Sequence, residues 1–342
     1  MSHPPRRIRL ARRAVAAGYG AAATLAKTLP EPFVRAVFKL AADVAWRRRG
    51  RGVVQLEANL RRVVPSISDD EMHALSRRAL RSYARYWLEF FRLPVLGADR
   101  ILGRMSVDGE ERLRAALDSG RGAILALPHT GNWDHAGAWV ALRGNPFTTV
   151  AERLKPESLF DRFVAVRERL GMEVLPLTSD ASTFAVLLKR LRAGQLVCLV
   201  SERDLATSGV EVSFFGEPTT MPAGPASLAI ATGAALLPTT LWFTDDSGPA
   251  SRRGSGPGSG RRVGRGGGWG ATIHPEIVPP AEGDRRAKVA AMTQQLADAF
   301  ASGIAEHPHD WHMLQPLWIA DRAAPRATST GADAAIGEPV SP

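Results

Sequence analysis

From about residue 107 onward, short apolar runs alternate with segments of helical periodicity. The clearest run, Ala123–Leu127, is a short apolar strand, and a helical pattern follows it near Trp133–Leu142. Strands separated by helical patterns of about 10–15 residues predict a sheet layered between helices. The predicted fold class is therefore α/β, with a mixed central sheet flanked by helices.

The remaining elements of this pattern can be placed by periodicity and by the glycines that end helices. We expect strands at 123–127, 148–151, 173–177, 195–200 and 236–243. We expect helices at 133–142, 156–170, 180–192, 223–232 and 285–306.

Two helices are expected before the alternation begins. Phe33–Arg49 is basic and amphipathic, with apolar residues at helical spacing and basic residues on another face. Such a helix either packs on the core with its charges in water, or lies on a membrane with its arginines among anionic head groups. The second helix begins at a capping box, Ser68–Glu71, and ends at Pro94. Its apolar stripe is expected to pack in the core.

The net charge of +10 is concentrated at the N-terminus, since residues 1–52 hold twelve of the 44 basic residues and only two acidic ones. This excess predicts contact with a polyanion, either an anionic membrane surface or nucleic acid. The sequence has no nucleic-acid recognition motif, so the membrane surface is the expected partner. No run reaches the roughly 20 apolar residues that cross a bilayer. The nearest, 14–26, imitates a secretory signal, but we expect it to be retained.

We divide the chain into three parts. Residues 1–106 form a helical, membrane-associating region, 107–322 an α/β core, and 323–342 a disordered tail. Within the core, the Arg- and Gly-rich segment 247–268 is expected to be a flexible insertion. A single cysteine, Cys198, excludes a disulfide framework and is expected to be a buried core thiol.

The best candidate for chemistry is the turn that follows the first apolar strand. The strand stops at Pro128, and His129 comes next. A neutral histidine can take a proton at neutral pH, and an acid bound to its other ring nitrogen would fix the tautomer. Asp134 could be that acid if the backbone bends at Gly131, because residues five apart do not face each other on a straight helix. A polar turn without function is the alternative.

Several blocks, found in order over roughly residues 30–320, carry a resemblance to a known family. They are His129-Thr-Gly-Asn-Trp-Asp134, Glu202-Arg-Asp204, Gly209–Gly216, Met221–Pro225 and His307–Gln315. The H-x4-D form of the first block resembles glycerolipid and lipid A-type acyltransferases. Together the blocks resemble the bacterial lipid A biosynthesis acyltransferases, and most of all the actinobacterial branch that acylates mannosylated inositol phospholipids. Segment 247–268 has no counterpart in this pattern.

The resemblance implies acyl transfer without an acyl-enzyme. The donor would be an acyl-thioester, acyl-CoA, with palmitoyl-CoA expected, and the acceptor a mannose hydroxyl of a mannosylated phosphatidylinositol. His129 would be the general base, and the oxyanion would need donors from backbone amides near 129–132 or from an arginine. No cofactor and no metal are implied. The enzyme would be peripheral, on the cytoplasmic face of the plasma (inner) membrane.

Further site residues follow from the same resemblance. Glu202 follows the strand around Cys198, so in a parallel sheet it could reach the edge that holds His129 and orient the imidazole in place of Asp134. Pairing with its neighbour Arg203 is the structural alternative. The substrate side of the site would be formed by further polar residues: Glu152, Arg167, Arg203 and Asp204.

Two other functions remain open at the level of the sequence. A related enzyme would acylate a lipid A-type or other glycolipid acceptor, and a protein without catalysis would bind membranes or nucleic acid. The segment His307–His312 imitates a metallo-hydrolase string, but its aspartate, Asp310, is displaced from the position that the pattern requires. We therefore expect no metal there.

Overall fold

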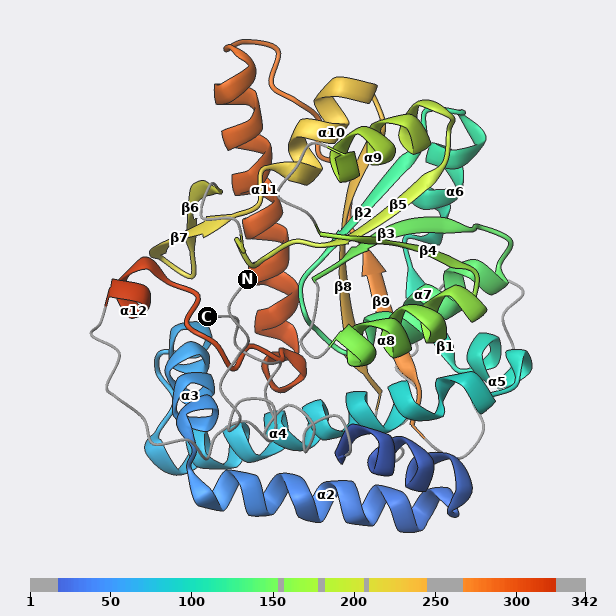
Figure 1. Cartoon of the computed structure of the whole chain (residues 1–342). Helices are drawn as coiled ribbons and strands as arrows, with labels where there is room; N and C mark the ends of the chain where they lie inside the picture. The colour runs from blue at the N-terminus through green and yellow to red at the C-terminus, as the bar shows by residue number, and fades with distance from the viewer. Residues whose placement is uncertain (1–17, 153–156, 178–181, 206–208, 245–266, 324–342) are drawn as a thin grey trace, which may run out of the picture.

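A computed structural model describes residues 18–152, 157–177, 182–205, 209–244 and 267–323. Its centre is a single large sheet (Figure 1). The seven strands are β1 (Met105–Asp108), β2 (Ala123–Leu127), β3 (Phe147–Ala151), β4 (Met172–Pro176), β5 (Leu196–Val200), β8 (Ala235–Phe243) and β9 (Trp269–Ile273). Their order is β1-β9-β8-β2-β5-β3-β4. Neighbours run parallel except β8 and β9, which are antiparallel, so the predicted mixed α/β sheet is confirmed.

Helices cover both faces of this sheet because its strands are apolar on both sides. Ile124 and Ala126 of β2 pack with α9 (Ser182–Arg192), α10 (Gly224–Thr232) and α11 (Arg285–Glu306). Leu125 and Leu127 point the other way, into a cluster with α6 (Glu110–Asp118) and α7 (Trp133–Leu142). This alternation is the period-two pattern of a strand that is buried on both faces. Helix α8 (Glu157–Arg169) packs on the same side as α7, against β4.

Most predicted elements are confirmed. The helices expected at 133–142 and 285–306 have those bounds, and the other predicted strands and core helices agree to within two residues. The capping box at Ser68 is present: its side chain accepts from the Glu71 N–H, and the Glu71 carboxylate accepts from the Ser68 N–H. This cap begins α4 (Asp69–Arg92).

Other elements were not predicted. They include α3 (Arg51–Val63), α5 (Ala98–Gly103), α6, the edge strand β1, β9, and a separate hairpin, β6 (Val210–Phe214) with β7 (Glu217–Met221). β1 has only four residues and pairs with β9 alone, which itself follows the Gly-rich segment directly. Short edge strands of this kind carry too little periodicity to be recognised without their partners.

Some predictions fall on residues that the structure does not describe. These are the first 17 residues with much of the basic N-terminus, nearly all of the Arg/Gly-rich segment, and the tail from residue 324. In the described part, the N-terminal run of helices without strands ends with α5, and the first strand of the sheet begins at Met105. No helix within the described ranges is long and apolar enough to cross a membrane.

The helix predicted at 33–49 is α2 (Glu31–Arg48), which lies alongside α4 at the edge of the molecule (Figure 1). Its inner face buries Val34 and Ala42. The apolar stripe Phe33, Val37 and Leu40 faces outward, with Phe33 58% and Leu40 61% exposed. α2 therefore packs on the core through one face and presents a second apolar face to the surroundings.

Candidate active site

The site lies where β2 and β5 end. These two strands are parallel neighbours, with Leu127 opposite Val200, so their carboxyl ends meet at one edge of the sheet. His129 follows the first strand and Glu202 the second. The prediction that both residues emerge at the same edge is confirmed. An α/β sheet commonly holds its ligands at this edge.

Glu202 is the carboxylate that holds His129. Its Oε1 lies 2.6 Å from His129 Nδ1 and also accepts the His129 backbone N–H at 2.7 Å. The Glu202 side chain is fully buried, whereas the imidazole is 21% exposed. Burial alone raises the pKa of Glu202, but the charge and hydrogen bonds of His129 outweigh it and hold this pKa below its usual value. The ionised Glu202 therefore accepts the Nδ1 proton, which leaves Nε2 of the neutral ring free to act as a base.

Asp134 has different partners, so the alternative that it orients His129 is wrong for this structure. Its carboxylate accepts from Nε of Arg167 at 2.6 Å and from the Tyr86 hydroxyl at 2.9 Å. Asp134 is the second residue of α7, and its side chain turns toward α8 and α4 instead of back along the turn. Asp134 thus links three helices, with Arg167 as its ion-pair partner.

The bend expected at Gly131 is present. Gly131 has φ +56°, and a Cβ there would lie 2.9 Å from the carbonyl carbon of Leu241. Only glycine fits such a close approach in the left-handed region. The bend does not return Asp134 to His129. Instead it lets the turn pair with a C-terminal segment: Gly131 N–H donates to Asp310 O, and His312 N–H donates to His129 O, both at 2.9 Å.

The polar face of α4 is the part of the site that the sequence analysis missed. Ser82, Tyr86 and Glu89 recur at helical spacing, and each anchors a different part of the site. Ser82 binds the segment after α11, Tyr86 binds Asp134, and Glu89 accepts from the Asn132 amide at 2.9 Å. Burial raises the pKa of Glu89, but an arginine on the same helix and further hydrogen bonds lower it below its usual value. The only sequence signal was this i, i+4, i+7 spacing beside an apolar stripe.

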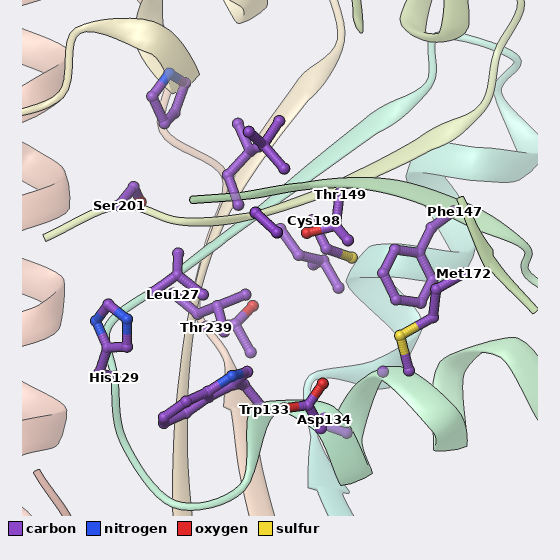
Figure 2. Close-up of a pocket in the computed structure, with 18 of the residues that line it drawn as sticks. Leu127, His129, Trp133, Asp134, Phe147, Thr149, Met172, Cys198, Ser201 and Thr239 are labelled. Atoms are coloured by element: carbon purple, nitrogen blue, oxygen red, sulfur yellow. The ribbon is translucent and has the colours of Figure 1, made fainter. Parts of the chain in front are cut away.

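A cavity of about 400 Å³ opens beside His129. This volume falls within the roughly 300–1,000 Å³ that is usual for small-molecule sites. Figure 2 shows His129 and Trp133 at one end of the cavity and Phe147 and Met172 at the other. Between them, apolar side chains from the sheet and α7 form the walls: Leu125, Leu127, Trp139, Val140 and Leu199. The cavity therefore has the form of an apolar slot with a polar mouth.

The prediction of a buried core thiol at Cys198 is confirmed in part: the side chain packs against the core cluster but is not fully buried. Its side chain lies in the wall of this cavity and is half-buried (Figure 2). Burial raises the pKa of the thiol. A thiol that stays protonated is a weak nucleophile, so Cys198 acts as part of the apolar lining.

The predicted substrate-side residues gather around the cavity. Glu152 follows β3, and Arg203 and Asp204 follow Glu202; all three line the cavity, as do Asp134 and Arg167. Glu202 itself is absent from the lining because it lies buried behind His129. The Asp204 carboxylate accepts the Gly209 N–H at 2.8 Å, which ties the loop after β5 to the start of β6.

Three of the four turn amides considered from the sequence, those of residues 129–131, donate to groups within the protein. The N–H of His129 donates to Glu202, that of Thr130 to Pro128 O, and that of Gly131 to Asp310 O. Of the two kinds of oxyanion donor considered from the sequence, these amides are therefore the weaker choice. Arg203 lines the cavity next to His129 and offers the cationic alternative.

The C-terminal histidines have structural surroundings. The described residues contain no group of three or more His, Cys, Asp or Glu that could hold a metal ion. His307 stacks on Trp242, with ring centroids 4.8 Å apart, whereas His312 is buried against Ser82 of α4. The block His307–Gln315, noted in the sequence for its resemblance, therefore braces the turn that carries His129.

A histidine that a buried carboxylate holds beside an apolar cavity fits an enzyme that acts on fatty acyl groups. Residues 5–320 match the family model described as bacterial lipid A biosynthesis acyltransferase. The chain belongs to this family and is an acyltransferase, as its sequence blocks predicted.

Curated relatives extend the resemblance over most of the chain. A phosphatidylinositol mannoside acyltransferase of Mycolicibacterium smegmatis is 48% identical over 315 residues, covering 92% of this chain and 94% of the relative. Phosphatidylinositol mannoside acyltransferases of two Mycobacterium tuberculosis strains are also 48% identical, over 314 residues and 90% of each chain. The resemblance to this branch of the family is thereby confirmed. Membership of an acyltransferase family rules out the alternative hypothesis of a protein that binds membranes or nucleic acid without catalysis.

Proposed function

We propose that this enzyme transfers a fatty acyl group from acyl-CoA to a mannose hydroxyl of a phosphatidylinositol mannoside. Relatives that are 48% identical over 314–315 aligned residues are named phosphatidylinositol mannoside acyltransferases, which supports the acceptor. The observation that carries the mechanism is the His129–Glu202 pair at the mouth of the apolar cavity. The other parts of the site supply the acyl pocket and a cation.

His129 acts as the general base. With Nδ1–H donated to Glu202, Nε2 accepts the proton of the acceptor hydroxyl as its oxygen attacks the thioester carbonyl. The buried carboxylate stabilises the imidazolium that forms. The carbon–sulfur bond then breaks, and the imidazolium proton goes to the departing thiolate. No acyl-enzyme is needed, because the thioester is already activated.

The acyl chain lies in the 400 Å³ cavity. Its apolar walls match a hydrocarbon chain, and its polar mouth at His129 brings the thioester carbon to the base. Burial of each methylene contributes about 0.8 kcal/mol, so the free energy of binding becomes more favourable as more of a long acyl chain enters the cavity. Palmitoyl-CoA is the donor that we expect.

Arg203 stabilises the oxyanion that forms on the thioester carbonyl. This side chain lines the acyl cavity together with His129, whereas the amides of residues 129–131 donate to internal acceptors. A guanidinium beside the carbonyl stabilises the negative charge that develops in the transition state.

A competition experiment tests whether the enzyme prefers mannosylated phosphatidylinositol or a lipid A-type acceptor. Wild-type enzyme receives palmitoyl-CoA with equimolar mannosylated phosphatidylinositol and a lipid A precursor, and labelled products are resolved by mass. We expect the label in the mannosylated phospholipid. Predominant labelling of the lipid A precursor would overturn the proposed acceptor.

The enzyme works at a membrane surface, on the cytoplasmic face of the plasma membrane. Support comes from the outward stripe of α2, where Phe33, Val37 and Leu40 stand exposed next to basic residues of the same helix. Such a face places its apolar side chains at the level of the acyl chains and its cations among anionic head groups. The lipid acceptor is then reached without leaving the bilayer.

A further inference from the structure

A second, smaller cavity shares His129 with the acyl cavity. It has a volume of about 20 Å³, room for one hydroxyl-sized group. Five residues line both cavities: Tyr86, Trp87, His129, Trp133 and Arg203. The rest of its lining comes from Tyr83 of α4 and from residues 312–315. The base therefore stands between an apolar slot and a small aromatic and polar recess.

His312 belongs to this recess, and its hydrogen bonds fix its tautomer. The Ser82 hydroxyl donates its one proton to Asp310 Oδ1 at 2.6 Å. Its oxygen also lies 3.1 Å from Nε2 of His312, so Nε2 must carry the proton of that second bond. Asp310 is held in turn by the Phe243 N–H, which donates to Oδ2 at 2.8 Å.

The fixed tautomer leaves Nδ1 of His312 as a bare acceptor. Within the described part of the chain this atom is buried and has no hydrogen-bond partner. His312 is only 6% exposed, and burial lowers its pKa to about 3, so the ring stays neutral at physiological pH. A buried acceptor without a donor lowers stability, so a native atom of this kind calls for an explanation such as a catalytic role or a bound group. A hydroxyl is the group that this recess can take.

We propose that His312 accepts a hydrogen bond, through Nδ1, from a second hydroxyl of the acceptor, and so helps to select a polyol with neighbouring hydroxyls. The inference rests on the proposed function, since it concerns the acceptor of the same reaction. The backbone N–H of His312 also donates to the backbone carbonyl of His129, so the recess and the base keep a fixed geometry. One hydroxyl then meets His129 while its neighbour meets His312.

Two substitutions separate this role from a structural one. His312→Gln can keep the donor to Ser82 but moves the acceptor away from the Nδ1 position, whereas His312→Asn keeps an oxygen near that position and loses the Ser82 bond. Steady-state kinetics are measured with palmitoyl-CoA and purified mannosylated phosphatidylinositol. We expect His312→Gln to raise KM for the glycolipid at least tenfold with KM for palmitoyl-CoA within twofold. His312→Asn should raise the glycolipid KM less.

The matched control is His274→Gln, because Nε2 of His274 lies 3.0 Å from the Thr240 hydroxyl and His274 lines neither cavity. It should leave both KM values at the wild-type level. An unchanged glycolipid KM in His312→Gln, or a larger rise in His312→Asn, would overturn the proposal while the proposed function stands. Absence of transfer by the wild type would instead remove the proposed function.

Discussion

At the residue scale, the central feature is which acid holds the base. His129 and Asp134 share a turn, but Glu202 comes from another strand and binds Nδ1, while Asp134 pairs with Arg167. The sequence offered both carboxylates, and sequence spacing cannot choose between them. The choice depends on β2 and β5 being neighbours, although two strands lie between them in the chain.

Replacing each acid by its amide separates their roles. Glu202→Gln removes the charge that holds the tautomer and stabilises the imidazolium, so kcat should fall about 10²–10⁴-fold, whereas Asp134→Asn should change kcat by less than about tenfold. Asp134→Asn instead leaves Arg167 without its ion-pair charge and should lower the free energy of unfolding by about 3–5 kcal/mol. Thioester release and urea denaturation measure the two effects. A larger kcat loss in folded Asp134→Asn would contradict the assignment.

Buried His135 predicts a pH dependence of stability. Its ring stacks on Trp269 with centroids 3.5 Å apart, and burial lowers its pKa to about 4, from about 6.5 in the unfolded chain. Between these values the unfolded chain takes up a proton that the folded chain does not. The free energy of unfolding should therefore fall by roughly 1 kcal/mol per pH unit as pH drops from about 6.5 to 4, and His312 adds to the same slope.

The measurement is urea denaturation across this pH range, with His135→Phe as the test. This variant should lose part of the slope, because a ring without nitrogen cannot titrate. The same slope in His135→Phe as in the wild type would show that His135 does not carry the effect.

At the element scale, α4 braces several parts of the site at once. One face packs apolar residues into the N-terminal helices, and the adjacent face carries Ser82, Tyr86 and Glu89 to the turn and its braces. The sequence predicted this helix, its capping box and its apolar stripe. It did not predict the polar face, because the partners of that face lie about 50 to more than 200 residues away in the chain.

Helix α7 sets the depth of the acyl cavity at Gly137. A Cβ at this position would lie 2.9 Å from Met172 Cε and 3.0 Å from Phe147 Cζ, both in the cavity lining. Gly137→Val should shorten the slot. Losing the burial of two methylenes costs about 1.6 kcal/mol, so kcat/KM for palmitoyl-CoA should fall roughly tenfold relative to lauroyl-CoA.

The control for this effect is Gly103→Val at the end of α5, where an added Cβ meets nothing within 4 Å. It should keep the wild-type order of donors. If Gly137→Val also keeps that order while remaining folded, the acyl chain does not pass this position.

At the scale of the whole molecule, the α/β core could be predicted well. Its long helices and central strands have strong periodicity, as α7 and α11 illustrate, and glycines mark several helix ends. The short strands β1 and β9 and the β6–β7 hairpin were not predicted. Their identity as strands depends on partners that sequence alone does not reveal.

The outward face of α2 predicts membrane binding. Replacing Phe33, Val37 and Leu40 by serine removes the exposed apolar stripe and leaves the basic residues in place. Because burying each such side chain contributes about 1.5–3 kcal/mol when complete, binding to anionic vesicles should weaken by more than about tenfold. Vesicle sedimentation at low salt measures this change.

The control replaces three exposed apolar residues elsewhere, Leu142, Val278 and Ile319, by serine. Vesicle binding should then remain at the wild-type level. Equal losses in both triple variants would mean that α2 has no special part in docking.

His129 is the proposed base in acyl transfer to a mannosylated phospholipid. The most direct test follows acylated product from palmitoyl-CoA and purified mannosylated phosphatidylinositol, comparing wild-type enzyme with folded His129→Ala. Wild type should form the acylated product, and His129→Ala should form it about 10²–10⁴-fold more slowly. Undiminished transfer by His129→Ala would contradict the account.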